Sequence, residues 1–232
     1  MSIDDPRVAR GMQAQLARRR ALLDGGDRPL GWKIGFGSDA AMQRLGITAP
    51  LVGFLLQSAR LEPDATVSLA GFVKPAAEPE IAVHMGKDLA AGADRDAAAA
   101  AIAALGPAIE LADIDVPPDD VETILRGNIY QRHVVLGRGD SRRAGGDVAG
   151  VTAIAFRGGT EVARTSDPQA NMGNVIDLVR HVADLLAACG ERLRAGEIII
   201  TGSVVAPVYL EPDERVFAFA LDPIGRIAVR FA

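Results

Sequence analysis

The chain has 232 residues, of which 49% are hydrophobic, and a formal net charge of −5. This length fits one large domain with a sizeable core, and the acidic balance, with no basic run longer than residues 18–20, argues against nucleic acid as the main partner. No segment approaches the roughly 18 apolar residues that a membrane-spanning helix needs, and the single cysteine, Cys189, cannot form an internal disulfide. We therefore expect a cytoplasmic protein with no membrane partner.

The first half of the chain alternates helical patterns with short apolar runs. Helices are predicted over residues 6–24, 38–45 and 94–105. Strands are predicted over residues 31–35, 66–69, 80–84 and 108–114. Ser38 is the expected cap of the second helix and Gly46 its end. We expect residues 1–60 to form an N-terminal helical and lid-like segment and residues 61–232 to form the core of the same catalytic domain, 1–232.

The second half has more strands than helices. A hairpin is predicted around Gly158 and Gly159. Further strands are predicted over residues 128–136, 148–156, 161–163, 197–201, 215–221 and 227–231. One helix, over residues 174–188, carries a continuous apolar stripe. Because strands and helices do not alternate regularly, the pattern indicates a mixed α+β fold.

Paired glutamates in a predicted strand form the strongest chemical signal in the sequence. Glu78 and Glu80 are two residues apart, so their side chains share one face of a strand, and Glu110 follows thirty residues later. Like charges held this close repel unless a cation or proton lies between them. Oxygen ligands suit Mg2+ or Mn2+. Spacing alone leaves open that Glu78 and Glu80 decorate the solvent-exposed face of an antiparallel strand.

A nucleotide-binding oxidoreductase is an alternative raised by residues 35–40. This segment, Gly-Phe-Gly-Ser-Asp-Ala, fits G-x-G-x-x-A between a strand and a helix, with Glu62 downstream. Glu62 precedes Pro63 in a predicted turn, and the chain does not continue with alternating strands and helices. We therefore disfavour a dinucleotide site.

Four segments in this order resemble the fumarylacetoacetate hydrolase superfamily, and specifically its 2-oxopent-4-enoate hydratase and 4-oxalocrotonate decarboxylase branch. They are residues 31–35 (GWKIG), 78–82 (EPEIA), 107–110 (PAIE) and 196–203 (GEIIITGS). The resemblance spans roughly residues 10–231. It implies a mixed β-roll fold and a habit of homo-oligomer formation.

The resemblance also implies roles for individual residues. It makes Glu78, Glu80 and Glu110 the carboxylate ligands of Mg2+ or Mn2+, and it places Lys33 in the same pocket. The turn formed by Thr201, Gly202 and Ser203 would help to hold the carboxylate of a small 2-oxo acid substrate. Lys33 would attract an anionic substrate or move a proton. Without the resemblance, Lys33 reads as a lysine at a strand edge with its ammonium in water.

A hydratase also needs a group that positions the attacking water. His133 and Asn128 are the candidates, because a histidine exchanges protons near neutral pH. Arg132 could pair with a second carboxylate of a dicarboxylate substrate. The sequence departs from the hydratases here, with Ile129, Tyr130, Arg132 and His133 where small residues are expected. Each polar side chain in this segment can instead be interpreted as a residue on the polar face of a sheet, with no role in the reaction.

Four other titratable residues have weaker claims to a role. His84 lies four strand residues from Glu80, about 13 Å away, which is too far for a metal ligand. Asp113 could orient a ligand or a lysine. His181 reads as a residue that packs a helix, and Cys189 as a small residue at a helix end.

The sequence thus predicts a metal-dependent hydratase acting on a 2-hydroxy-2,4-dienoate or 2-oxo-enoate from aromatic ring cleavage. A 4-oxalocrotonate type of decarboxylase is the main alternative, because it uses the same metal centre. An acylpyruvate type of C–C hydrolase is less favoured. In those relatives an early Glu–His pair often activates water, and this chain has no histidine before His84.

Overall fold

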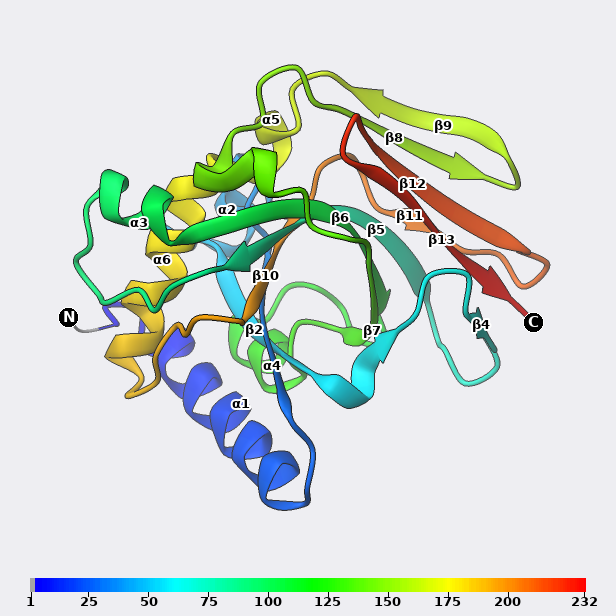
Figure 1. Ribbon diagram of the computed structural model, residues 1–232. Helices are drawn as coiled ribbons and strands as arrows, with labels where there is room; N and C mark the ends of the chain where they lie inside the picture. The colour runs from blue at the N-terminus through cyan, green and yellow to red at the C-terminus, as the bar shows by residue number, and fades with distance from the viewer. Residues whose placement is uncertain (1–2) are drawn as a thin grey trace.

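The computed structural model describes residues 3–232, and its strands form two β-sheets with most helices at the end away from the smaller sheet (Figure 1). In spatial order the larger sheet contains β2 (Leu51–Leu56), β1 (Pro29–Gly35), β10 (Ile198–Ser203), β5 (Pro75–Met85), β6 (Ile102–Asp113), β7 (Gln131–Leu136) and β3 (Arg60–Leu61), and β11 (Val208–Tyr209) pairs with β5. The smaller sheet contains β4 (Thr66–Val67), β13 (Gly225–Phe231), β12 (Val216–Asp222), β8 (Thr152–Arg157) and β9 (Thr160–Thr165).

The helices are short except for two. They are α1 (Pro6–Asp24), α2 (Asp39–Leu45), α3 (Arg95–Ala101), α4 (Val121–Arg126), α5 (Gln169–Met172) and α6 (Val175–Ala188), with the 3-10 helices η1 (Gln57–Ala59) and η2 (Ser141–Gly146). Ser38 and Asn174 cap α2 and α6 by accepting hydrogen bonds from backbone N–H groups of the first turn. Gly46 ends α2 in the left-handed conformation. These predicted helix boundaries are confirmed.

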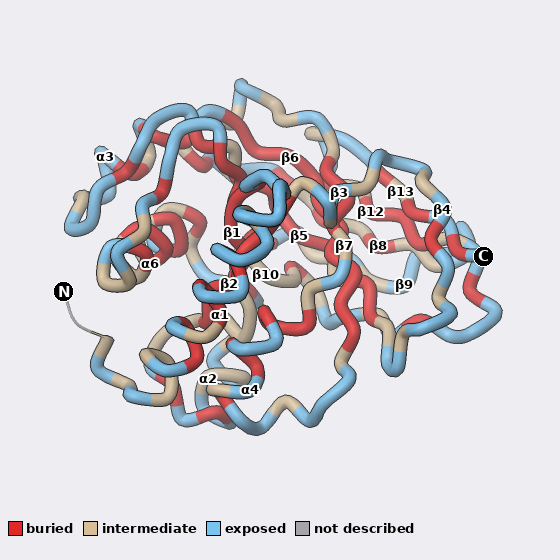
Figure 2. Tube along the Cα trace, turned by 90° about the horizontal axis from the view of Figure 1, so that it is seen from below, coloured by how far each residue is buried: buried red, intermediate tan, exposed pale blue. Residues whose placement is uncertain are grey.

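The central strands of the larger sheet are largely buried, as the burial colouring of Figure 2 shows. β5 and β6 are long antiparallel partners, and their register places Glu78 opposite Glu110. β10 pairs with β5 on the other side, and β1 runs parallel to β10. Strands from distant parts of the sequence therefore meet around one carboxylate cluster.

Several predicted element boundaries are wrong, including the end of one helix and the start of one strand. The alanine-rich helix ends at Ala101 rather than at residue 105, because Ile102 pairs with Met85 and the chain continues as β6. Sheet pairing here outweighs the helix propensity of alanine. The predicted strand 128–136 begins only at Gln131, and the preceding residues form α4 and a turn. The sequence reading missed α4 altogether.

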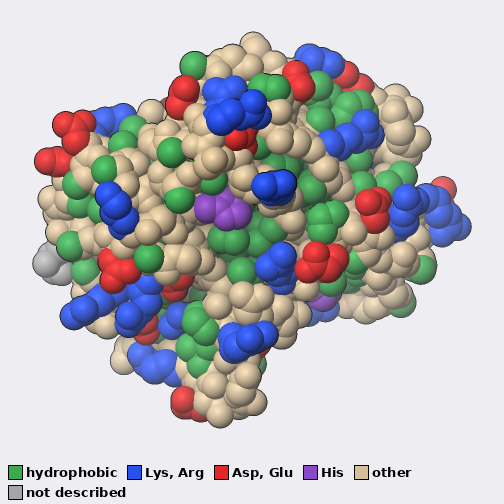
Figure 3. Space-filling view, in the orientation of Figure 1, with side chains coloured by type: hydrophobic (Ala, Val, Ile, Leu, Met, Phe, Trp, Pro, Cys, Tyr) green, Lys and Arg blue, Asp and Glu red, His purple; other side chains and the backbone are tan. Residues whose placement is uncertain are grey.

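Residues 1–60 contribute β1 and β2 to the larger sheet in addition to α1 and α2. This segment, expected to be helical and lid-like, is therefore part of the same folded unit as residues 61–232. Within the described residues, no helix is both long and apolar enough to cross a bilayer. Acidic and basic side chains intermingle on the face seen in Figure 3.

Candidate metal and substrate site

Three glutamates from neighbouring strands converge inside the larger sheet. Carboxylate oxygens of Glu78, Glu80 and Glu110 lie within 4.8 Å of one another. Glu80 and Glu110 are fully buried, so the alternative that Glu78 and Glu80 decorate a solvent-exposed strand face is wrong for Glu80, while Glu78 is half-buried. A buried cluster of like charges is stable only if protons or a cation balance it.

In two of these carboxylates, one oxygen accepts a hydrogen bond and the other has no hydrogen-bond partner among the described residues. Glu80 Oε2 accepts a 2.7 Å hydrogen bond from the backbone N–H of Gly202, and Glu110 Oε1 accepts one from Lys33 Nζ. Glu80 Oε1 and Glu110 Oε2 are buried and have no hydrogen-bond partner among the described residues. Since buried oxygens without partners are costly, this donor set fits a shared hard divalent cation.

Burial shifts the titration of all three carboxyl groups. It raises the pKa of Glu78 to about 7, with a further contribution from the charge of Glu110, while Lys33 opposes the shift. Burial also raises the pKa of Glu80 and of Glu110 above the ordinary value. A divalent cation would replace these protons. Together with Lys33, three ionised carboxylates and one such cation sum to zero charge.

Lys33 is buried at the centre of β1. Its ammonium donates one hydrogen bond to Glu110 and another, of 2.9 Å, to the carbonyl oxygen of Ile129. A Cβ on Gly53 would lie only 2.8 Å from Lys33 Cγ and 2.9 Å from Asn128 Oδ1. Glycine at position 53 therefore makes room for both side chains. The lysine is a fixed part of the site and not the hydrated edge residue that its sequence context also allowed.

The Ile129 carbonyl belongs to a strained turn. Asn128, Ile129 and Tyr130 have φ values of 60°, 53° and 62°, in the left-handed region that L residues avoid. Asn128 holds the turn by accepting a 2.8 Å hydrogen bond from the Phe54 N–H and donating one of 2.9 Å to the Phe54 carbonyl. Strain of this kind persists where surrounding contacts fix it, often at functional sites.

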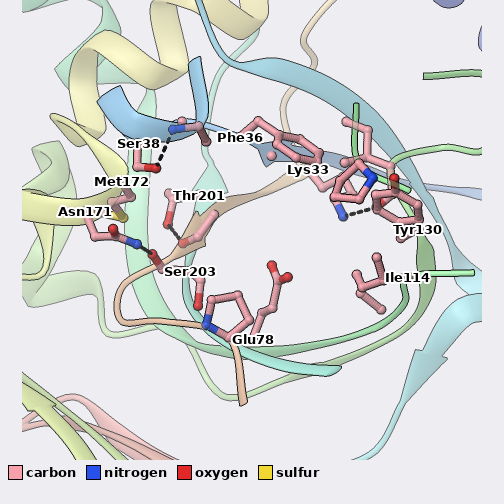
Figure 4. Close-up of a pocket in the computed structure, with 18 of the residues that line it drawn as sticks. Lys33, Phe36, Ser38, Glu78, Ile114, Tyr130, Asn171, Met172, Thr201 and Ser203 are labelled. Atoms are coloured by element: carbon pink, nitrogen blue, oxygen red, sulfur yellow. Dashed lines mark hydrogen bonds between the residues drawn. The ribbon is translucent and has the colours of Figure 1, made fainter. Parts of the chain in front are cut away.

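A cavity of about 310 Å³ opens beside the cluster. Figure 4 shows Glu78 pointing into the space between Lys33, Thr201 and Tyr130. Phe36, Ile114, Ile129 and Met172 supply apolar walls. The Tyr130 hydroxyl is buried and has no hydrogen-bond partner among residues 3–232. Burial, reinforced by nearby Asp115 and Asp119, raises the pKa of Tyr130 to about 12. This hydroxyl therefore stays protonated at neutral pH and remains a donor.

The turn at the end of β10 forms another wall of the cavity. Thr201 Oγ1 is committed to the backbone of Ile81, donating to its carbonyl at 3.2 Å and accepting from its N–H at 3.3 Å. Gly202 has a φ of 87° and gives its N–H to Glu80. Ser203 lines the cavity, and its buried Oγ has no hydrogen-bond partner in the described part of the chain. Among the three residues of this turn that were predicted to bind substrate, Ser203 is therefore the one whose side chain is available to do so.

Arg132 and His133 do not line the cavity beside the glutamates. His133 pairs with Leu111, the neighbour of Glu110, so it points to the opposite face of the sheet from the carboxylates. Both residues line a separate cavity of about 460 Å³, where Arg132 lies 5.2 Å from the Phe72 ring. Asn128 also lines that second cavity, while its side chain binds Phe54. The structure thus separates these three side chains from the predicted metal ligands.

The remaining candidates have structural contacts. Asp113 accepts hydrogen bonds from the N–H groups of Val73 and Lys74, at 2.9 and 2.8 Å, and within residues 3–232 it forms no hydrogen bond with the three glutamates. His181 Nε2 lies 2.8 Å from the Pro50 carbonyl oxygen, which agrees with its expected role in packing α6. Cys189 follows the last residue of α6, as predicted.

Sequence reasoning missed several cavity residues. Tyr130, expected on a polar strand face, is buried in the left-handed turn, because a run of β-favouring residues concealed the turn. Phe36, with a φ of 57° between two glycines, lines the cavity opposite Tyr130, and their ring centroids are 6.4 Å apart. Asn171 donates a 2.6 Å hydrogen bond to the Ser203 carbonyl. Its sequence context carried no signal for this contact.

The glycine-rich segment 35–40 has a different role from the one its motif suggested. It connects β1 to α2, but β1 pairs with an antiparallel β2 and a parallel β10 late in the chain. This is not the consecutive parallel order of a dinucleotide-binding sheet. The segment instead supplies Gly35, Phe36 and Gly37 to the cavity beside the glutamates.

Comparison with known proteins gives consistent matches. The family model described as fumarylacetoacetate (FAA) hydrolase C-terminal matches residues 36–232. The chain is 28% identical over 218 residues to 2-keto-4-pentenoate hydratase 1 of Dechloromonas aromatica (strain RCB), covering 92% of this chain and 81% of that protein. It is 30% identical over 211 residues to 2-hydroxyhexa-2,4-dienoate hydratase of Comamonas testosteroni, covering 89% and 79%.

A solved structure shares the whole architecture. The 4-oxalocrotonate decarboxylase from Pseudomonas putida G7, complexed with magnesium and adipate, superposes with a TM-score of 0.88 at 25% identity. The match covers 97% of this chain and 86% of that one. The same enzyme has also been solved with calcium and acetate.

Proposed function

The chain belongs to the fumarylacetoacetate hydrolase family, and we propose that it is a metal-dependent hydratase that adds water to a 2-hydroxy-2,4-dienoate or its 2-oxo-enoate form. The resemblance of its four sequence segments to this family is confirmed, as is the fumarylacetoacetate hydrolase-like mixed fold. One observation carries the proposal. Two buried carboxylates and one half-buried carboxylate meet a buried lysine at the wall of a cavity sized for a small acid, and each buried carboxylate has one oxygen without a partner among the described residues.

We assign Glu78, Glu80 and Glu110 as ligands of a divalent cation, with Mg2+ or Mn2+ as the preferred ions. The all-oxygen donor set and the divalent ions held by the related decarboxylase support this assignment. When bound, the cation would stabilise negative charge that develops on the C2 oxygen of the substrate. The hydrogen bonds from Gly202 and Lys33 hold the Glu80 and Glu110 carboxylates in position, where they would serve as ligands.

Groups of the chain itself would handle the substrate. Lys33 carries its ammonium beside the carboxylates, where it would attract the substrate carboxylate and exchange a proton with the dienol. Ser203 Oγ and the Tyr130 hydroxyl, both buried in the cavity wall without partners, would donate hydrogen bonds to the substrate. The apolar side chains would exclude bulk water around the diene. We propose these roles in place of a direct contact from Arg132, Asn128 or His133.

Decarboxylation is the second candidate, because Arg44 lines the same cavity. Its guanidinium forms no ion pair or hydrogen bond with any residue in the described range 3–232. Such a cation would complement the second carboxylate of a 2-oxo dicarboxylic acid. The related decarboxylase binds adipate, which is a dicarboxylate, and this similarity adds to the argument.

A paired assay separates the two reactions. The metal-stripped protein would be incubated with 2-hydroxypenta-2,4-dienoate and with 4-oxalocrotonate, each with and without Mg2+ or Mn2+. We expect metal-dependent loss of dienoate absorbance and formation of 4-hydroxy-2-oxopentanoate. Metal-dependent release of CO2 from 4-oxalocrotonate alone would establish the decarboxylase. Inactivity toward both substrates, with intact metal binding, would contradict the hydratase and the decarboxylase. The assignment of the metal site would not be affected.

We also propose that the protein works as a homo-oligomer in the cytoplasm. Exposed apolar side chains such as Val73, which is 74% exposed, and Tyr209, which is 48% exposed, offer surface for association. A lone cysteine suits a reducing compartment. Light scattering on the purified protein gives the oligomeric state directly, and a monomeric mass would contradict this part of the proposal.

A further inference from the structure

The second cavity, of about 460 Å³, lies behind the turn that holds Lys33. Its walls come from α1, β2, η1, the loop 68–72 and the start of β7. The turn is shared between the two cavities. Ile129 and Tyr130 face the cavity beside the glutamates, while Asn128 and Gln131 line this one. The two cavities are therefore distinct, but the segment 128–131 separates them and contributes two residues to each.

The charge of the second cavity is positive. Arg18 and Arg132 line it, and none of its lining residues is acidic. Arg18 forms no ion pair among residues 3–232. Arg132 lies 3.8 Å from Asp113, but that carboxylate already accepts hydrogen bonds from two backbone N–H groups. A small anion would therefore meet two guanidinium groups, which are the preferred partners of carboxylates.

Polar atoms in the wall also lack partners. Gln131 Nε2 and His133 Nδ1 are buried, and neither has a hydrogen-bond partner among the described residues. A buried amide donor without an acceptor costs free energy that a bound oxyanion would recover. His133 has its pKa lowered by burial and by the neighbouring Arg132, so it is neutral at pH 7 and does not need an acidic partner.

The rest of the cavity is apolar. Leu22, Phe54, Leu56 and Phe72 line it. Phe72 also fixes the position of Arg132, whose guanidinium lies 5.2 Å from the ring centroid. A cavity with two cations, two free polar atoms and hydrocarbon walls suits a carboxylate with a short aliphatic body better than inorganic phosphate, which has no apolar part.

We propose that this second cavity is a binding site for a small aliphatic carboxylate, held by Arg18, Arg132 and Gln131 and separate from the metal centre. The bound anion would lie against Asn128, on the reverse side of the turn whose Ile129 carbonyl accepts a hydrogen bond from Lys33. This inference does not depend on the reaction that the metal centre catalyses.

Butyrate is the probe, and ligand-detected NMR on the full-length protein with Mg2+ measures its affinity. We expect saturable binding of butyrate and none of the uncharged butyramide. Arg18→Met and Arg132→Met should each weaken the binding at least about tenfold. The matched control is Arg20→Met, which removes the same charge from the same helix but lies outside the cavity lining. It should leave the affinity unchanged.

A second variant separates this site from the metal centre. Glu80→Gln disables the proposed metal site and should leave butyrate binding intact. If binding is lost in Glu80→Gln but survives both arginine substitutions, the probe occupies the metal centre and the proposal is overturned. Absence of butyrate binding, equal binding of butyramide, or tighter binding of inorganic phosphate with the same arginine dependence would also overturn the assignment to an aliphatic carboxylate. Circular dichroism checks that each variant is folded.

Discussion

The backbone N–H of Gly202 donates a 2.7 Å hydrogen bond to Oε2 of Glu80. This contact joins the end of β10 to the middle of β5, at a point where the register between the two strands shifts. It leaves Oε1 of the same carboxylate buried and without a hydrogen-bond partner in the described range 3–232. One short turn therefore both orients a predicted metal ligand and brings Ser203 to the wall of the cavity.

Glu80→Gln should abolish tight divalent metal binding while preserving the fold. The amide keeps an oxygen that can accept the Gly202 N–H, but it loses the negative charge that a cation needs. Calorimetric titration with Mg2+ or Mn2+ should show affinity reduced at least about 100-fold. Glu211→Gln, a change at an exposed glutamate, is the control and should bind metal like the wild type. Unchanged affinity in Glu80→Gln would remove this residue from the site.

Lys33→Met should lower kcat at least about 100-fold, because it removes the only ammonium group that contacts the carboxylate cluster in the described residues. The methionine stem fills the same buried space. Glu110 also loses the charge that favours its ionised form, so metal affinity at pH 7 should fall, though less than in Glu80→Gln. Steady-state kinetics at saturating metal separates the two effects. Wild-type kcat under those conditions would exclude Lys33 from the reaction.

Part of the carboxylate cluster was predictable, because strand parity is a local consequence of sequence. Glu78 and Glu80 share a face by their spacing, and the capping residue Ser38 marked the start of one helix. The resemblance to a known family then linked Glu110 and Lys33 to the pair.

The surroundings of the site were harder to predict. Residues 128–136 have high β-propensity, so the left-handed turn at Asn128–Tyr130 was hidden, and with it the shift that sends His133 to the other face. Only the pairing of Leu111 with His133 shows that the histidine and Glu110 point in opposite directions. Such register is a tertiary property that single-sequence patterns do not encode.

Gly53→Ala should impair catalysis more than the addition of a single methyl group suggests. The new methyl group would lie 2.8 Å from Lys33 Cγ and 2.9 Å from Asn128 Oδ1, and both side chains are held by other hydrogen bonds. We expect a loss of about 1–3 kcal/mol in the free energy of unfolding and a fall in kcat. Urea unfolding and kinetics measure both.

Gly225→Ala is the matched control for this substitution. A Cβ at that position meets only Pro107, at 3.7 Å and beyond, which is ordinary van der Waals contact. It should retain near wild-type activity. If Gly53→Ala behaves like Gly225→Ala, the packing around Lys33 is looser than the structure indicates.

Asn128→Ala should destabilise the left-handed turn. It removes both hydrogen bonds to the Phe54 backbone and places alanine in a conformation that costs roughly 1–2 kcal/mol for an L residue. Asn128→Gly loses the same hydrogen bonds but accepts the positive φ freely, so it should be the more stable of the two variants. Chemical unfolding of both gives the comparison. Equal stability of the alanine and glycine variants would show that backbone strain contributes little here.

Metal affinity should rise with pH through neutrality. Burial raises the pKa of Glu78 to about 7, so without metal the proton is held at pH 6 and released at pH 8. For one such group the ionised fraction grows about tenfold over this range, and the affinity for Mg2+ should grow by at least that factor. Calorimetry at pH 6, 7 and 8 tests this, and Glu80→Gln provides the baseline. Affinity independent of pH would mean that Glu78 is already ionised in the metal-free protein.

The same shift predicts opposite stability trends with and without metal. An acid whose pKa is higher in the folded than in the unfolded chain favours unfolding as pH rises from its ordinary value toward the raised one. Metal-free protein should therefore lose thermal stability between about pH 4.5 and pH 7 through Glu78 and its buried neighbours. Saturating Mg2+ binds the ionised, folded form, so the Tm increase that it causes should be larger at pH 8 than at pH 6. Melting curves at matched ionic strength measure both trends, and a metal-induced increase that shrinks as pH rises would contradict the assignment of these carboxylates as ligands.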